Sequence, residues 1–524
     1  MEKKDRQPFF YDVTLRDGNQ ALRRPWNTAE KEVIFRQLLR LGVQAVEVGF
    51  SGASDMDFEA CQHLAKIAKN ENLKDIEISG LARTVERDIK KVYDAIHEAP
   101  KPRIHTFIGL SPFAMEHVLK LKSKEVQKKA IEAVRFAKSL LGKKGRVEFS
   151  AEHFGDCADN LDFVIETFLG CIEAGASVIN LPNTVERTRP SEFIELVQKA
   201  ADALPKDSVM IAVHTHNDLG MATATTVESY FAGATQLECC LNGLGERAGN
   251  TNLFEVAVAL HCSGVNVPLN MNEIYETSLL ISEMSGVPIY EKAPLVGSDA
   301  LAHRSGIHQD GTAKTKDMKK GAYRSFDPTL IGLEPGELIT FTSQSGKTAI
   351  CEIIQQAGWP ISIKEAVYLQ PFMKSRAEEV GELKEDEVFD VYFKKLFHVD
   401  GNFEFHDFFE IVKQIPSSKE KSHLEFYRIK YSYDKEKRSQ ETKGDGPIDA
   451  CLNAIREAGF QVKLLHYEQK AVQKERKGSA SDAMTVIKLK NDNNGEVVIC
   501  RGLNPDTRAA NIEAIFNGLN LLGL

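Results

Sequence analysis

Hydrophobic residues in the first half of the chain form short apolar runs, each followed by a longer segment whose apolar residues lie three or four positions apart. Short apolar runs predict buried strands, and the spacing of three to four predicts amphipathic helices. The apolar runs are residues 9–15, 45–50, 76–82, 104–110, 146–152, 177–184, 208–213 and 235–241. Helical segments between them include residues 29–41, 125–140 and 160–174. Gly42 stands where the first of these helices is expected to end.

Eight consecutive strand–helix units predict a (β/α)8 TIM barrel in residues 1–295. An open, doubly wound sheet is the competing arrangement, but such a sheet rarely needs eight regular units. A dinucleotide-binding fold is also disfavoured, because no Gly-x-Gly-x-x-Gly follows the first predicted strand. In TIM barrels the chemistry takes place at the carboxyl ends of the strands. The residues that follow the predicted strands are therefore the candidates for a functional site.

The rest of the chain predicts three further domains. Residues 296–360 are expected to form a linker subdomain, and residues 361–422 a charged, helical subdomain. A polar stretch at 416–422 is typical of a linker. Residues 423–524 are expected to form a C-terminal α+β domain. Its strands are predicted at 424–433 and 483–489, and its helices at 448–458 and 509–522.

Composition narrows the classes of function. The chain has 524 residues, of which 42% are hydrophobic and 27% charged, as expected for a soluble protein of more than one domain. Its net charge of −9 and the lack of a basic segment argue against nucleic acid as a partner. No secretion signal is evident, and no apolar run reaches the ~18 residues of a membrane helix. Nine scattered cysteines without a Cys-x-x-Cys pair indicate reduced thiols and a cytoplasmic location.

Two histidines after the seventh strand are candidates for metal ligands. Side chains alternate along a strand, so His214 and His216 lie on one face, close enough to share an ion. Two imidazoles suit a divalent metal, and a carboxylate or amide oxygen can complete the set. Two histidines that merely end a strand are the commoner case, but polar residues after the other strands favour a site. These are Arg16, Asp17, Arg83, Glu152, Asn183, Thr184, Glu246, Arg247 and Asn250.

Three segments carry a resemblance to a known family: residues 14–20 (TLRDGNQ), 214–218 (HTHND) and 243–250 (GLGERAGN). Together they resemble the Claisen-condensing branch of the DRE-TIM metallolyase family. A fourth match, residues 305–311 (SGIHQDG), lies beyond the barrel. Residues 444–450 (GDGPIDA) are similar to the start of the family's leucine-binding regulatory domain.

The resemblance implies a metal-dependent condensation of acetyl-CoA with a 2-oxoacid. It favours 2-oxoisovalerate, which would place the reaction in leucine biosynthesis. Pyruvate, the substrate of the corresponding reaction in isoleucine biosynthesis, is the alternative, and 2-oxoglutarate ranks third. A hypothesis of another class is an inactive barrel that serves as a regulatory subunit, but the intact Arg16, Asp17, Glu246 and His308 argue against it. A homodimer and a leucine effector are further implications.

The resemblance also assigns roles at the metal. Asp17, His214, His216 and Asn250 would hold the ion, leaving its remaining positions for the carboxylate and keto oxygens of the oxoacid. Mixed nitrogen and oxygen ligands do not decide between zinc, manganese and magnesium. Arg16, next to Asp17, is suited to the negative charge that develops on the keto oxygen.

Further residues are expected to bind the oxoacid. Thr184 matches the family's threonine after the sixth strand, which holds the substrate carboxylate. Glu152 either contacts the oxoacid or pairs with Arg16. Leu81 is the candidate that reads the oxoacid side chain, because it closes the third strand. No cation is evident for a second carboxylate, with Arg83 the one candidate that would change this expectation.

The condensation also needs a base that takes a proton from the methyl group of acetyl-CoA. The resemblance assigns this role to His308, assisted by Glu246 and Tyr323. Because His308 lies outside the barrel, it would reach the site from its own subunit or from a partner subunit. The family's effector pocket usually contains a serine-threonine-aspartate run, which residues 501–508 (RGLNPDTR) lack. We therefore expect reduced sensitivity to leucine.

Overall fold

The structure is a computed structural model that describes residues 6–315, 318, 321–333, 338–412, 425–472 and 482–524. The chain divides into two compact units. The first unit comprises Met1–Ala302 and Asp317–Glu337, and the second His303–Lys316 and Leu338–Leu524. The buried hydrophobic residues of the barrel form one cluster, and those of the second unit form two.

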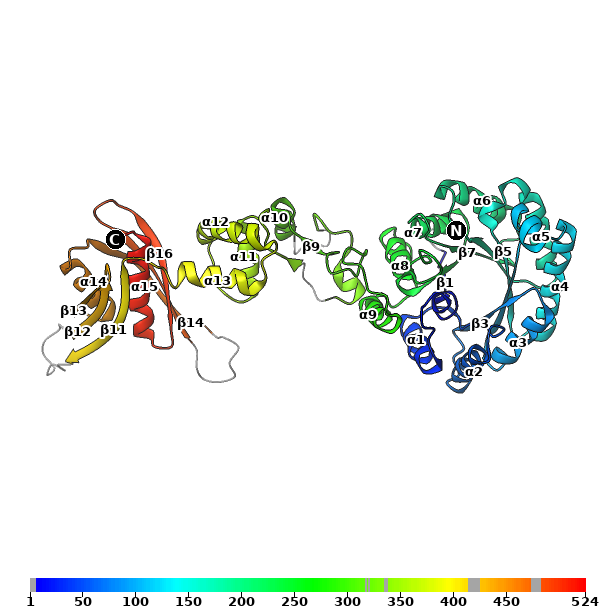
Figure 1. Ribbon diagram of the computed structural model, residues 1–524, viewed down its shortest axis with the longest axis horizontal. Coiled ribbons are helices and arrows are strands. Elements are labelled where there is room, and N and C mark those ends of the chain that lie inside the picture. Colours follow the sequence, from blue (N-terminus) through cyan, green and yellow to red (C-terminus); the bar gives the residue numbers. More distant parts are fainter. Residues whose placement is uncertain (1–5, 316–317, 319–320, 334–337, 413–424, 473–481) are drawn as a thin grey trace. The chain divides into compact units, whose positions relative to one another are not determined.

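The first unit contains a closed parallel barrel, which confirms the predicted (β/α)8 fold. Its strands are β1 (Phe9–Asp12), β2 (Ala45–Glu47), β3 (Glu77–Arg83), β4 (Pro102–Gly109), β5 (Arg146–Glu152), β6 (Val178–Asn183), β7 (Met210–Thr215) and β8 (Gln236–Cys239). Strand β1 closes the ring, because it pairs with β2 through Tyr11 and Ala45 and with β8 through Phe9 and Gln236. Figure 1 shows the helices as an outer layer around these strands.

The side chains of Asn27, Ser54 and Asn252 each cap the start of a barrel helix. The barrel helices are α1 (Thr28–Leu41), α2 (Asp55–Asn70), α3 (Glu86–Ile96), α4 (Ser123–Leu141), α5 (Leu161–Glu173), α6 (Pro190–Ala203), α7 (Ala222–Ala232), α8 (Leu253–Cys262) and α9 (Ile274–Ser285). Before α1, the Asn27 side chain accepts a hydrogen bond from the Glu30 N–H, and the Glu30 carboxylate accepts one from the Asn27 N–H. Gly42 ends α1 in the left-handed conformation, as expected.

Strand β1 is shorter than the predicted run of residues 9–15. The Asp12 carboxylate accepts hydrogen bonds from the backbone N–H and the hydroxyl of Thr14, at 2.9 and 2.8 Å. These bonds turn the chain into the π-helical turn η1 (Thr14–Gly18). The turn carries Arg16 and Asp17, so both residues leave the strand direction at the carboxyl end of the barrel.

The inner face of the barrel is polar, which the apolar runs did not predict. Arg103 on β4 donates hydrogen bonds to Gln236 on β8 and Glu148 on β5, at 2.6 and 3.0 Å. All three side chains are fully buried. Since β4 and β8 are not neighbours in the ring, these side chains meet inside the barrel. Polar residues at alternate positions of β4, β5 and β8 therefore fill part of its interior.

The second unit includes a helical region with its own core. Its helices are α10 (Gly306–Thr315), α11 (Lys347–Gln356), α12 (Ile363–Val380) and α13 (Glu385–Leu396). The short strands β9 (Ala302–His303) and β10 (Leu338–Ile339) pair with each other. Phe341, Ile350, Leu369 and Tyr392 are central to the core of this region.

Short helical turns complete the chain: η2 (Ala114–Leu119), η3 (Phe154–Asp156), η4 (Ala158–Asn160), η5 (Leu241–Gly243), η6 (Met271–Glu273) and η7 (Pro328–Ile331).

The C-terminal part has the predicted α+β composition. One antiparallel sheet contains β11 (Phe403–Val412), β12 (Glu425–Tyr433) and β13 (Glu436–Gly444), and the other contains β14 (Val462–Val472), β15 (Asp482–Asn491) and β16 (Val497–Asn504). The helices α14 (Pro447–Glu457) and α15 (Thr507–Leu521) pack against them. Strand β11 falls within residues 361–422, for which helices were expected. Its Phe403 packs in the core of the C-terminal sheets, so this segment belongs structurally with β12. The expected linker at 416–422 lies outside the described residues.

Two further observations concern the helices and the cysteines of the chain. Within the described ranges, every helix is too short or too polar to cross a bilayer. All nine cysteines are unpaired thiols, and Cys262 is the one classed as exposed.

Candidate metal centre and active site

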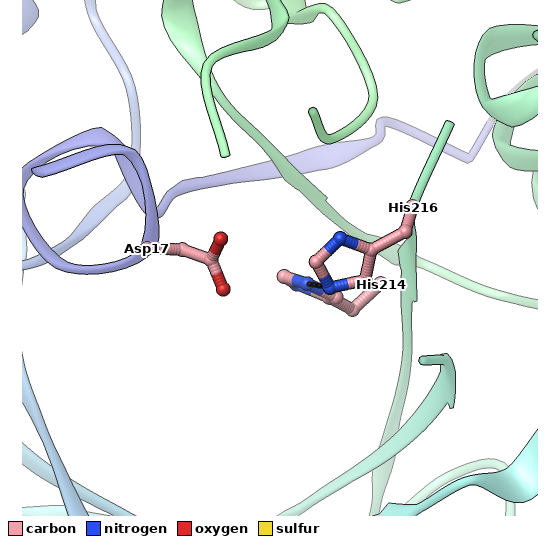
Figure 2. A group of neighbouring side chains, drawn as sticks. All are labelled: Asp17, His214 and His216. Carbon is pink, nitrogen blue, oxygen red and sulfur yellow. Dashed lines mark hydrogen bonds between the residues drawn. The ribbon is translucent and has the colours of Figure 1, made fainter. Parts of the chain in front are cut away.

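Three predicted ligands converge at the carboxyl end of the barrel. Asp17 comes from the turn after β1, His214 from β7, and His216 from the residue just beyond β7. Figure 2 shows the carboxylate facing the two imidazole rings. The possible ligand atoms of these side chains lie within 4.8 Å of one another, and all three residues are buried.

The spacing of the two imidazoles fits a shared ion. The Nε2 atoms of His214 and His216 face each other at 3.4 Å. Two nitrogens that each lie about 2.1 Å from a metal, at angles of about 90–110°, are separated by roughly 3.0–3.4 Å. The residues present therefore suit a divalent cation between these nitrogens.

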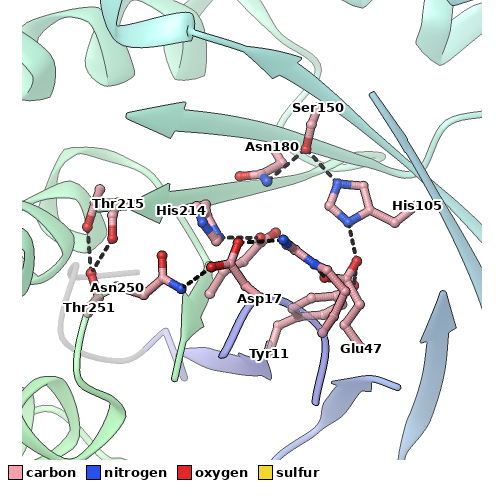
Figure 3. A network of polar contacts seen from close by, with 12 residues as sticks. Tyr11, Asp17, Glu47, His105, Ser150, Asn180, His214, Thr215, Asn250 and Thr251 are labelled. Carbon is pink, nitrogen blue, oxygen red and sulfur yellow. Dashed lines mark hydrogen bonds and ion pairs between the residues drawn. The ribbon is translucent and has the colours of Figure 1, made fainter. Parts of the chain in front are cut away.

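Asn250 lies beside these ligands. Its amide nitrogen donates to Asp17 Oδ1 at 2.9 Å and to the Leu244 carbonyl at 3.1 Å, which fixes the side chain. Its Oδ1 is buried and has no hydrogen-bond partner among the described residues. Because a buried amide oxygen without a partner is costly, this atom is suited to coordinate an ion. Figure 3 shows Asn250 and Asp17 joined at the edge of the polar network.

The electrostatic environment keeps the ligands in the protonation states that bind metal. Burial and the neighbouring His214 lower the pKa of His216 to about 3, and burial lowers the pKa of His214. Burial alone would raise the pKa of Asp17, but Arg16 outweighs it and holds the pKa below its usual range. The site thus offers two neutral imidazoles and one carboxylate near neutral pH.

Arg16 joins the metal site to the barrel interior. Its Nη1 pairs with Asp17 Oδ2 at 2.5 Å, and its Nε pairs with Glu47 Oε2 at 2.5 Å. Glu47 on β2 is completely buried. The sequence offered Glu152 as the alternative partner of Arg16, but Glu47 and Asp17 are the acids that pair with it. Arg16 is held by two carboxylates at the edge of the cavity described next.

A cavity of about 310 Å³ opens above the ligands. Its lining includes the predicted substrate residues Leu81, Glu152 and Thr184. The Thr184 hydroxyl oxygen accepts a hydrogen bond from the His153 N–H at 2.9 Å, so its proton is available for another acceptor. Burial raises the pKa of Glu152. The structure thus brings these three residues to the metal site, while their roles remain predictions.

Arg83 does not line this cavity. Its side chain is 61% exposed and pairs with Asp88 at 2.6 Å. The arginines that do line the cavity are Arg16 and Arg247, and Arg247 pairs with both oxygens of Asp218, at 2.7 and 3.0 Å. Among the described lining residues, each arginine therefore already has a carboxylate partner.

The three residues assigned to proton transfer are in different places. Glu246 lines the cavity, and its backbone N–H faces Asp17 Oδ1 at 3.4 Å. Tyr323 is 41% exposed and is not part of the described cavity lining. His308 lies on α10, which belongs to the second compact unit. The roles of His308 and Tyr323 remain predictions from the resemblance.

Several residues of the site were missed in the sequence. His105 on β4 contacts Glu47 through Nδ1 at 2.7 Å and Ser150 through Nε2 at 2.6 Å, and Asn180 donates to the Ser150 hydroxyl at 2.8 Å. Figure 3 shows this chain of contacts. His105, Ser150 and Asn180 all line the cavity. The sequence did offer one signal for such residues. Arg103 and His105 are polar residues two positions apart, in or next to an apolar run, so their side chains lie on the same face of the strand.

The apolar part of the cavity was also only partly predicted. Phe50, Phe107 and Pro182 line it together with Leu81. These four residues come from β3, β4, β6 and the segment after β2. They form an apolar wall beside the metal ligands, where the side chain of a small substrate can be buried.

Comparison with known families covers most of the chain. The HMGL-like family matches residues 7–281, which span the barrel. The post-catalytic domain of α-isopropylmalate synthase matches residues 299–355, and the LeuA allosteric (dimerisation) domain matches residues 384–522.

Individual relatives agree with these family matches. A "2-isopropylmalate synthase 2" of Leptospira interrogans is 57% identical over 374 residues, covering 71% of this chain and 86% of that protein. A 2-isopropylmalate synthase of Ruminiclostridium cellulolyticum is 33% identical over 517 residues, covering 98% and 96% of the two chains. The same name belongs to a protein of Haemophilus influenzae that is 34% identical over 521 residues, covering 98% and 96%.

Proposed function

We propose, from the premise that the chain belongs to the HMGL-like family and within it to the 2-isopropylmalate synthases, that it condenses acetyl-CoA with 2-oxoisovalerate. Carbon–carbon bond formation gives the CoA thioester of the product, and water cleaves that thioester to release 2-isopropylmalate and CoA, so the enzyme is an acyltransferase of leucine biosynthesis. The observation that carries the proposal is the facing pair of imidazole nitrogens, 3.4 Å apart, in a cavity with an apolar wall. A chelating oxoacid with a small apolar side chain fits both features.

The ligand set of this proposal is Asp17, His214, His216 and Asn250. These residues would hold a divalent ion, which would supply Lewis-acid activation of the keto carbonyl. Arg16 places a guanidinium beside the same position and stabilises the negative charge that develops on the keto oxygen. The Thr184 hydroxyl donates a hydrogen bond to the substrate carboxylate, and Glu152 lines the same cavity.

Carbon–carbon bond formation requires prior removal of a proton from acetyl-CoA. We assign removal of the acetyl-CoA methyl proton to His308, with Tyr323 and Glu246 assisting. The base needs to be close to this weak carbon acid, because the enolate is unstable in water. The resemblance of residues 305–311 supports the assignment of His308, and the cavity position of Glu246 supports its part.

Substrate choice is the direct test of this proposal. We expect kcat/KM to be highest for 2-oxoisovalerate, lower for pyruvate and lowest for 2-oxoglutarate. The isopropyl group buries two more carbons than a methyl group, at ~0.8 kcal/mol each, which corresponds to a preference of roughly tenfold over pyruvate. A second carboxylate meets only arginines that are already paired. Thiol release measured over a panel of oxoacids gives these ratios.

A variant of Leu81 tests whether the apolar wall selects the side chain of the oxoacid. Leu81→Ala is expected to lower kcat/KM for 2-oxoisovalerate more than for pyruvate, because the isopropyl group loses a packing partner. A panel in which wild type prefers pyruvate would instead indicate citramalate synthesis by the same mechanism. Unchanged ratios in Leu81→Ala would show that Leu81 does not read the side chain.

We also propose leucine as an effector that binds the C-terminal part of the chain. A cavity of about 530 Å³ lies there, at the start of α14. Asp449 and Arg456 offer opposite charges for an ammonium and a carboxylate group, and Ile448 and Leu452 offer apolar contacts. The residues that depart from the family's pattern have structural partners, since Arg501 pairs with Glu365 and Asp506 accepts the Arg508 N–H at the start of α15.

Regulation is therefore expected to be present but weak. Millimolar leucine should inhibit the intact enzyme in part, measured as the initial rate of thiol release at saturating substrates. Alanine at the same concentration serves as the control, because its side chain is too small to fill the apolar side of the cavity. Complete inhibition at micromolar leucine would contradict the expected weakness, and no response at all would contradict leucine as an effector.

We also propose an oligomeric state and a cellular location for the enzyme. A homodimer is supported by the match to the LeuA allosteric (dimerisation) domain and is tested by the mass in solution, which should be twice 58.4 kDa. A cytoplasmic location is supported by the nine unpaired thiols.

A further inference from the structure

The buried polar network of the barrel contacts one of the metal ligands. His214 on β7 and Glu238 on β8 are paired in the register of the two strands, so their side chains lie on the same face. The Nδ1 atom of His214 lies 3.1 Å from Glu238 Oε2. Glu238 is 1% exposed, so this contact is shielded from water.

Both oxygens of Glu238 face nitrogen atoms. Oε1 accepts a hydrogen bond from Gln236 Nε2 at 3.0 Å, and Oε2 faces the His214 ring. Gln236 Nε2 also donates to Glu148, and its oxygen accepts from Arg103 at 2.6 Å. The carboxylate of Glu238 is therefore held in place by hydrogen bonds that run through Gln236 to Arg103.

Filling the interior of a barrel with polar side chains is unfavourable in free energy, because these groups lose their hydration. Arg103, Glu148 and Glu238 are each at most 1% exposed, and burying ionisable groups costs hydration free energy even where they are paired. Apolar side chains of similar size fill TIM-barrel interiors more commonly. These polar groups lie next to the candidate metal site, through the contact of Glu238 with His214.

We propose that Glu238 is a positioning residue of the metal site. Its carboxylate accepts the Nδ1–H of His214, which leaves the lone pair of Nε2 directed at the ion, and Gln236 with Arg103 keeps that carboxylate in place. Hydrogen bonds of this kind fix the tautomer and orientation of ligand histidines and raise their basicity. This inference rests on the proposed metal site and extends it to Glu238, which lines the cavity beside His214, and to Gln236 and Arg103 behind it.

The test measures Zn²⁺ binding to the full-length, metal-free protein by calorimetry. Glu238→Ala is expected to weaken the affinity by about 10–100-fold, because His214 loses the partner that orients it. Glu238→Gln keeps an acceptor oxygen but no charge, so its affinity should fall between wild type and Glu238→Ala.

Glu77→Gln is the matched control. Glu77 pairs with Arg103 at 2.6 Å, so this variant removes a carboxylate from the same network without touching Glu238 or Gln236. Its affinity for Zn²⁺ is expected to stay within about threefold of wild type, because no ligand contact changes. Circular dichroism and thermal unfolding of the metal-free proteins show whether each variant is folded.

The outcomes separate the inference from its premise. Glu238 variants that bind Zn²⁺ as tightly as wild type would overturn the inference, as would an equal loss in Glu77→Gln, which would indicate general loosening of the barrel. Should Glu238→Ala fail to fold, the comparison of Glu238→Gln with Glu77→Gln decides in the same way. A wild-type protein that binds no Zn²⁺ would overturn the metal site itself.

Discussion

His214→Ala is expected to remove the metal and to lower kcat/KM for 2-oxoisovalerate by about a thousandfold or more, because Lewis-acid stabilisation contributes several kcal/mol to such a reaction. The fold should persist, since His214 lies at the end of β7, at the mouth of the barrel. Loss of its contact with Glu238 leaves a buried carboxylate with one donor fewer, at a cost of about 1–3 kcal/mol in the free energy of unfolding. Metal content, steady-state kinetics and circular dichroism measure the three effects.

His63→Ala is the control for this variant. His63 lies on α2, pairs with Glu32 and has a side chain that is 43% exposed, outside the cavity lining. Its loss should leave metal content and kcat/KM close to wild type. Substantial turnover by a His214→Ala protein without bound metal would refute the assignment of the site.

Arg16→Gln is expected to have a second large effect, on both rate and stability. Removing the guanidinium leaves Glu47 and Asp17 without their shared cation, which should lower the free energy of unfolding by about 3–5 kcal/mol. Loss of a cation beside the keto oxygen should lower kcat by about 10²–10³-fold, with a smaller change in KM. Kinetics with 2-oxoisovalerate and urea unfolding give the two values.

Arg83→Gln provides the comparison, because Arg83 also ends a strand and also pairs with an acid. Its side chain is largely exposed, so the pair with Asp88 contributes about 1 kcal/mol at most. Activity should stay near wild type. Equal kinetic defects in the two arginine variants would show that the position of Arg16 beside Asp17 has no special role.

The sequence predicted the parts of the site that follow strands. Asp17, His214 and His216 lie at or shortly after the ends of β1 and β7, and Asn250 lies in the segment between β8 and α8, at the end of the barrel where such side chains converge. The alternation of side chains along β7 was sufficient to place both histidines on one face. These positions could be predicted because every one of the eight strand–helix units follows the same local sequence pattern.

The partners inside the barrel could not be predicted in the same way. Glu47, His105 and Glu238 lie within apolar runs, and their contacts join side chains of different strands inside the barrel. Which acid pairs with Arg16 depends on the barrel's stagger: the sequence suggested Glu152, whereas Glu47 is the residue of β2 that pairs with it. Arg83 illustrates the opposite case, because Asp88 on the following helix α3 draws it away from the cavity.

The helical and C-terminal regions show a third kind of limit. Strand β11 has aromatic residues at alternate positions, yet the charged segments around it favoured a helical prediction. Its pairing with β12 decides its structure, since Tyr433 and Phe403 are partners in the sheet. Tertiary context of this type overrides local propensity.

The hydrogen bond from Arg103 to Gln236 has a consequence for how the barrel folds. The two residues are 133 positions apart, and the bond exists only when β8 has joined β1 and closed the ring. Until then, water hydrates the arginine and its glutamates, so the cost of desolvating them and the contacts that offset it both arise when the ring closes. Ring closure should therefore be a late, cooperative event. The many distant pairings it requires should make refolding slow compared with that of helical domains.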